Sequence, residues 1–200
     1  VSGGGALAQE SGGQPAASGA IEEIIVSARR RDESIQDTPI AVTAIAPSQL
    51  EGAAAVNISD LQGAAPNVLI TQQGSGSAAA NISIRGIAFA DIEKSFDPAV
   101  GINVDGVYIG TSTGQYLDFF DIGSIEILRG PQGTLFGRNI ISGVINIKRT
   151  RPTGEWGGKF EVSKGSYGKL GVRGVLNVPI AEGVLAAKLF EMHEESDGSY

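Results

Sequence analysis

The stretch Ile125–Arg149, which reads IEILRGPQGTLFGRNIISGVINIKR, constrains the fold of this chain more than any other feature. It contains two β-type runs, Ile125–Leu128 and Val144–Ile147, separated by residues that reverse the chain. The second run alternates isoleucine with polar residues, so its apolar side chains share one face of a strand. This pattern predicts two strands joined by a glycine-rich connection.

The connection itself has two turn signals. Gly130-Pro131-Gln132-Gly133 places proline at the second position of a four-residue turn, where its fixed φ fits, and Gly137 permits another tight backbone path. A phosphate cradle is the alternative, but no Gly-Lys-Ser/Thr follows the glycines and no helix-forming run opens after them. A nucleotide site is therefore disfavoured.

This stretch resembles the end of the plug domain of TonB-dependent outer-membrane receptors. The resemblance rests on IEILRGPQGTLFGRN, on SGVINI and on Thr150-Arg151-Pro152, and the segments Ala65–Val68, Ile82–Gly86 and Asp97–Tyr108 extend it. One departure is Ser142, which stands where the family usually has the first of two glycines. The resemblance implies a small α+β plug domain followed by an antiparallel transmembrane β-barrel, with 22 strands in the full protein.

The resemblance also implies roles for the central motif. Glu126 and Arg129 would pair with charges on the barrel wall and lock the plug in place. A pair within the plug surface is the alternative, since exposed ion pairs are common. The other motif residues are Gly130, Pro131, Gly133, Gly137, Arg138 and Asn139.

Charge and composition exclude several classes of function. The net charge of -7 disfavours a nucleic-acid partner, because phosphate binding needs clustered basic residues. No apolar run is long enough for a transmembrane helix. His193 is the single histidine and cysteine is absent, so neither a zinc site nor a Ser-His-Asp triad has the expected residues. We expect no enzyme, no metal and no cofactor.

The chain divides into five expected parts. Ala6-Leu7-Ala8 fits the small-residue rule of signal-peptide cleavage, with a disordered Gly/Ala linker as the alternative. The expected parts are the end of a signal peptide (1–8), a flexible tether (9–20), a TonB box with a hinge (21–31), the plug (32–152) and the first barrel strands (153–200).

The expected TonB box is a β-branched run directly after the tether. An extended segment of this kind can add as a strand to the sheet edge of a periplasmic partner, which the resemblance identifies as TonB. Its residues are Glu22, Glu23, Ile24, Ile25, Val26, Ser27 and Ala28.

Within the plug, short strands should alternate with short helices. Strands are expected at 40–46, 67–71, 82–85, 100–104 and 106–109, the last two joined by an Asp105-Gly106 turn. Helices are expected from Pro47, from an N-cap at Ser59 to near Pro66, and over 118–122.

Three glycine-rich loops lie between these strands, at 72–80, 87–97 and 110–116. Plain connecting loop is the simplest interpretation, although binding residues concentrate on loops of rigid scaffolds. In the resembled family these loops face the cell exterior and contact substrate. The candidate contact residues are Gln72, Gln73, Phe89, Asp91, Lys94, Phe96, Gln115 and Tyr116.

After residue 153 the pattern changes to strands with apolar residues at even positions. Trp156, Phe160 and Val162 begin this alternation, which is typical of transmembrane β-strands, although a soluble sandwich also alternates. Trp156 and Tyr167 are expected at the membrane interfaces. The third run, from Val184, alternates poorly because Lys188 and Phe190 share a face, which indicates a bulge or a rim position.

Taken with the resemblance, these features predict a receptor in the outer membrane of a Gram-negative bacterium, in contact with lipid. It would import a scarce small molecule, for example a ferric siderophore, using force from TonB. The alternatives are a soluble plug-like module that binds ligand without transport, and an enzyme that uses the glycine-rich turn.

Overall fold

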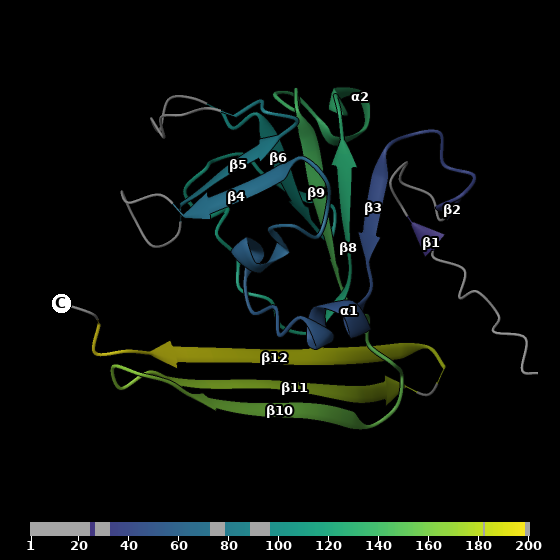
Figure 1. The fold of residues 1–200 in the computed structure, drawn as a ribbon. Helices are drawn as coiled ribbons and strands as arrows, with labels where there is room; N and C mark the ends of the chain where they lie inside the picture. Colours follow the sequence, from purple (N-terminus) through teal and green to yellow (C-terminus); the bar gives the residue numbers. More distant parts are fainter. Residues whose placement is uncertain (1–24, 27–32, 73–78, 89–96, 182, 199–200) are drawn as a thin grey trace, which may run out of the picture.

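The computed structural model of the chain describes residues 25–26, 33–72, 79–88, 97–181 and 183–198. Two bodies of secondary structure follow each other along the chain. A mixed α+β unit ends near Arg151, and a separate three-stranded antiparallel sheet lies beneath it (Figure 1). We call the first body the plug and the second the wall sheet.

A five-stranded mixed sheet forms the centre of the plug. Its order is β3-β8-β9-β6-β7, with β8 antiparallel to both neighbours and β9 parallel to β6. Both faces are buried, because the isoleucines of β8 and β9 point into one cluster while Leu128 and Val144 point into another. The strands are β3 (Val42–Ile45), β6 (Val100–Val104), β7 (Val107–Ile109), β8 (Ile122–Arg129) and β9 (Gly143–Arg149).

The expected hairpin between β6 and β7 is confirmed. Asp105 and Gly106 both have positive φ, at 50° and 90°, as a two-residue turn that matches strand twist requires.

Short elements cover one face of the central sheet. Proline at the first helical position starts α1 as expected, and β4 pairs with β5 in a two-stranded sheet. These elements are α1 (Pro47–Gly52), the 3-10 helix η1 (Ile58–Leu61), β4 (Val68–Gln72) and β5 (Ala80–Ile84).

The expected N-cap at Ser59 is wrong. Asn57 caps η1, and its Oδ1 accepts a hydrogen bond from the Ser59 backbone N–H at 2.9 Å. Asp60 completes the cap by accepting from the Asn57 N–H. The helix also ends at Leu61 instead of near Pro66, because Gln62 is already extended.

The helical turn expected over 118–122 is also wrong. Asp118 forms an isolated bridge with Asn57, the Phe119 N–H donates to the carbonyl of Val56, and Ile122 already belongs to β8. The segment forms no helix because these partners, together with the wall sheet, bind its backbone and side chains, and it bends at Phe120 and Asp121, where Asp121 has a positive φ of 58°.

The wall sheet is an antiparallel meander of β10 (Gly157–Lys164), β11 (Leu170–Ala181) and β12 (Leu185–Glu195). The predicted alternation is confirmed on the first two strands. Phe160 and Val162 are exposed on the side away from the plug, while Arg173 and Val175 are buried against it. Trp156 and Tyr167 are exposed at opposite ends of β10.

The irregular third strand also has an explanation. Lys188 and Phe190 both contact the plug, through an ion pair with Asp121 and a ring contact with Phe120. The strand pairing shifts between Pro179 and Ala181, opposite the start of β12. No helix in the described part of the chain is long and apolar enough to cross a bilayer.

Candidate functional site

The part of the expected TonB box that the structure describes is strand β1 (Ile25–Val26), paired with β2 (Glu33–Ser34). Val26 is 1% exposed and packs into the cluster of Leu128, Phe136, Ile140 and Val144. Strand β1 is therefore attached to the plug by a buried side chain. The other predicted box residues, Glu22, Glu23, Ile24, Ser27 and Ala28, lie outside the described residues.

The glycine-rich connection folds around one helical turn, α2 (Gly133–Phe136). The sequence predicted only a tight turn here, but the N–H groups of Leu135 and Phe136 donate to the carbonyl of Gln132. Phe136 gains burial in the same cluster as Val26, which favours the turn of helix. Gly130 and Gly137 have φ of 120° and 105°, as expected of positions that need glycine.

Pro131, Arg138 and Asn139 complete the connection. Asn139 has a positive φ of 67°, and its side-chain amide donates to the Asp97 carboxylate. Tyr108 lies nearby, and burial raises the pKa of its phenol, with a further rise from Asp97 and an opposing effect from Arg138. This end of the motif is thus fastened to the segment that precedes β6.

Ser142, which stands where the family usually has a glycine, fits its position without a positive φ. Its hydroxyl donates to the carbonyl of Ile84 at 2.7 Å, and its carbonyl accepts from the Gly130 N–H at 2.8 Å. The serine therefore ties the end of β5 to the connection before β9.

The structure gives Glu126 a partner inside the plug. Glu126 is 1% exposed, and Asn146 on the adjacent strand donates to its Oε2 at 3.0 Å. Arg129 is half-buried, and its Nε is buried without a hydrogen-bond partner among the described residues. The pairing of these two residues with a barrel wall stays a prediction.

The candidate substrate-contact residues separate into two groups. Gln72 is exposed at the end of β4, whereas Gln115 is 1% exposed and its amide donates to the carbonyls of Val100 and Ile109. Tyr116 packs on the core, and its hydroxyl lies 3.0 Å from that of Ser59. Gln115 and Tyr116 thus support their loop in this conformation. Gln73, Phe89, Asp91, Lys94 and Phe96 lie outside the described residues.

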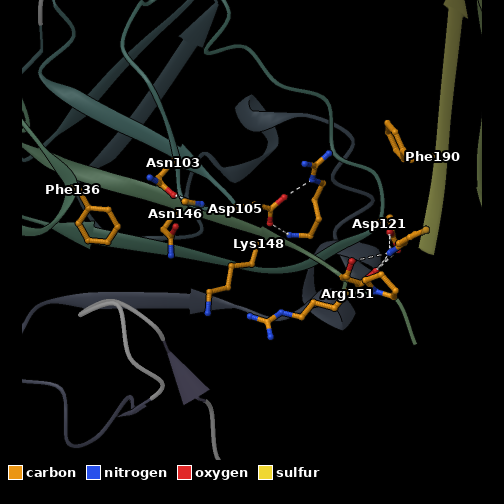
Figure 2. A pocket seen from close by; sticks show the side chains of 13 residues that line it. Asn103, Asp105, Asp121, Phe136, Asn146, Lys148, Arg151 and Phe190 are labelled. Carbon is orange, nitrogen blue, oxygen red and sulfur yellow. Dashed lines mark hydrogen bonds and ion pairs between the residues drawn. The ribbon is translucent and has the colours of Figure 1, made fainter. Parts of the chain in front are cut away.

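A cleft of about 640 Å³ lies between the plug and β12 (Figure 2). Asp105 binds Arg149 there, with 2.6 Å between Oδ2 and Nε, and Asp121 binds Lys188. Lys148 and Arg151 also line the cleft. Sequence analysis missed this site, because its residues come from segments as far apart in the chain as Asn103 and Phe190.

Among the described residues, no three histidine, cysteine or acidic side chains gather as metal ligands would. The geometry is that of a compact scaffold with charged contacts to the sheet beneath it.

Comparison with known proteins places this scaffold in a family. Residues 34–144 match the model of the TonB-dependent receptor plug domain. The pesticin receptor of Yersinia pestis is 29% identical over 176 residues, which cover 88% of this chain and 25% of the relative. The iron-regulated outer membrane virulence protein of Vibrio cholerae is 29% identical over 148 residues, covering 71% of this chain and 22% of that protein.

A solved structure gives the same result. The ferric yersiniabactin uptake receptor of Yersinia pestis superimposes with a TM-score of 0.68 at 30% identity, over 76% of this chain and 24% of that one. The chain spans about a quarter of the length of these relatives, two of which are receptors by name and the third an outer membrane protein. The chain therefore belongs to the plug-domain family of TonB-dependent receptors, which are outer-membrane receptors of Gram-negative bacteria.

Proposed function

We propose that the chain is the N-terminal part of a TonB-dependent outer-membrane receptor that imports a scarce nutrient into the periplasm. The observation that carries this proposal is the position of β1. It is a two-residue strand next to the N-terminal tether, it is attached to the plug through Val26, and the plug in turn rests on the wall sheet. A pull on this strand acts on the plug before it acts on the wall.

The partner in this mechanism is TonB. An extended segment around Ile25 adds as a strand to the sheet edge of TonB, so backbone hydrogen bonds supply the affinity. Withdrawing Val26 from its cluster exposes a valine side chain, which costs about 1.5–3 kcal/mol. Strand addition has to offset this cost, so the box stays docked until a partner engages it.

The substrate class follows from the relatives. The solved relative is an uptake receptor for ferric yersiniabactin, and a second relative is iron-regulated. We infer a ferric siderophore or a similar small molecule, bound at the outer face of the plug loops and imported without a chemical step. Exposed Gln72 is the described residue best placed for contact.

A proline substitution in the box tests the mechanism in the full-length receptor. Ile25→Pro removes a backbone donor from the strand, so energised uptake should be abolished while ligand binding at the cell surface is retained. Ile25→Val keeps the donor and is the matched control. Normal uptake by the proline variant would refute transport through this box.

The alternative is a soluble plug-like module that binds ligand without transport. The exposed apolar face of the wall sheet disfavours it, because Phe160 and Val162 would then face water.

A further inference from the structure

Four consecutive plug residues, Asp118–Asp121, face strands β11 and β12 of the wall sheet. We call this stretch the docking segment. The sequence predicted a helical turn here, but the segment bends at Phe120 and Asp121, and Phe119, Phe120 and Asp121 each contact a different group on the wall.

Asp121 carries the strongest of these contacts. Lys188 of β12 forms an ion pair with the Asp121 carboxylate and donates to the backbone carbonyl of Thr150 at 2.9 Å. The Thr150 hydroxyl also donates to Asp121 at 2.7 Å, and the Thr150 N–H donates to the Asp121 carbonyl at 3.0 Å. One wall cation thus holds the residue before β8 together with the residue after β9 (Figure 2).

The preceding residues add contacts of other kinds. The carbonyl of Phe119 accepts from Arg173 Nη1 at 3.4 Å, and Arg173 is held in place by Glu194. The rings of Phe120 and Phe190 have centroids 5.7 Å apart. The Arg173 side chain is 7% exposed and that of Lys188 is 12% exposed, so both cations are largely out of water.

A second lysine contact between the two bodies is different in kind. Lys159 of β10 lies 3.2 Å from Glu51 of α1, but both side chains are more than half exposed. Solvent screens such a pair, and it contributes little. A buried cation that loses its partner, in contrast, is strongly destabilising.

We propose that the docking segment fastens β8 and β9 to the wall while the N-terminal part of the plug moves. β3, which follows β1 and β2 in the chain, lies at the edge of the central sheet, and among the described strands it pairs only with β8. Force applied to β1 peels β3 from β8 before it reaches the fastened pair. This inference rests on the proposed transport function, and it assigns Lys188 and Asp121 as the residues that position the plug.

The test measures passage through the unenergised full-length receptor. In cells that lack TonB, entry of a large antibiotic through the receptor reports whether the plug still closes the barrel. Lys188→Met keeps the aliphatic stem but removes the cation, so the Asp121 carboxylate is left largely out of water without its partner, and antibiotic entry should rise above that of the wild type. Asp121→Asn is a milder second variant, since asparagine tolerates the positive φ of 58° at this position.

The matched control is Lys159→Met, the same substitution at the exposed lysine. It should leave antibiotic entry unchanged. The double variant Lys188→Met/Asp121→Asn should leak no more than the worse single variant, because both changes remove one shared contact. Correct assembly of each variant is checked by its migration before and after boiling.

Each outcome bears on the proposal. The proposal is supported if Lys188→Met and Asp121→Asn both leak, if their double variant leaks no more than the worse of the two, and if Lys159→Met does not leak. Wild-type closure in both variants, or equal leakage in Lys159→Met, overturns it. Because the assay needs neither substrate nor TonB, its failure is distinct from a failure of the Ile25→Pro experiment.

Discussion

Gly143 has a role that no other residue type can fill. A Cβ added there would lie 2.3 Å from the carbonyl oxygen of Leu128, which belongs to the β8–β9 pairing. The neighbouring Ile84 side chain would be 2.7 Å away. The glycine lets two central strands approach, so the motif residue before VINI is required by backbone contact.

We therefore expect Gly143→Ala to destabilise the plug by about 1–3 kcal/mol, the typical cost of overpacking. Gly133→Ala is the matched control, because a Cβ there meets nothing within 4 Å and alanine favours the helical turn. The measurement is the urea concentration at which protease cleaves the plug of the assembled receptor. Equal midpoints for the two variants would contradict this account of the close approach.

Asp118 links the docking segment to pH. Burial raises the pKa of its carboxyl, and nearby Glu194 raises it further, against the opposing effects of Arg173 and Lys169. Between the ordinary and the raised pKa, the folded protein binds more protons than the unfolded chain. The free energy of unfolding therefore falls as the pH rises through this window.

Asp118→Asn should remove this pH dependence. The variant should match the wild type at about pH 4, near the ordinary aspartate pKa, and resist urea better at about pH 7. Asp37 provides the control because it lies between β2 and β3, away from the charges of the wall sheet, and Asp37→Asn should leave the urea resistance unchanged at both pH values. A variant that is less stable than the wild type at neutral pH would mean that attraction to Arg173 dominates.

At the scale of elements, the wall strands differ from the strands of a soluble sheet in the face that carries charge. On β10 and β11 the outward face is apolar, whereas the inward face carries Arg173, which bonds to the plug. A soluble sheet would normally reverse this arrangement, with charge outward. The apolar outward face of β10 and β11 thus indicates that these strands face lipid.

Phe160→Arg tests the outward face of β10. Phe160 is 72% exposed, and an arginine facing lipid near the bilayer midplane costs about 2–4 kcal/mol. The variant should reduce the amount of heat-modifiable receptor in the outer membrane, and Phe160→Leu should not. Full tolerance of arginine, with the protein recovered in the soluble fraction, would favour the plug-like binding module.

At the scale of the whole molecule, contacts across the plug–wall boundary are distributed unevenly. The buried ones gather where β8 begins and β9 ends, while β1 and β3 lie at the margin of the plug (Figure 1). A receptor that moves part of its plug needs both regions. In the proposed mechanism, the segment around β1 detaches while the centre of the plug keeps a fixed support.

The sequence by itself determined the family, the hairpin at Asp105-Gly106 and the alternation of the first wall strands. These features depend on local backbone preferences and on the two-residue period of a strand, both of which are read from neighbouring residues. The family resemblance also located the motif around Gly130 and Gly137, where positive φ requires glycine.

Only the tertiary structure decided which side chains meet. Glu126 accepts a hydrogen bond from Asn146 on the neighbouring strand, and residues 118–122 were predicted as a helical turn but bend against the wall, with a positive φ at Asp121. Gln115 was expected on a surface loop, but its side chain is buried and donates hydrogen bonds to two backbone carbonyls. In each case at least one deciding partner lies 15 or more positions away in the chain. Local propensity carries no record of such a partner, and the free energy of burial and pairing overrides the local preference.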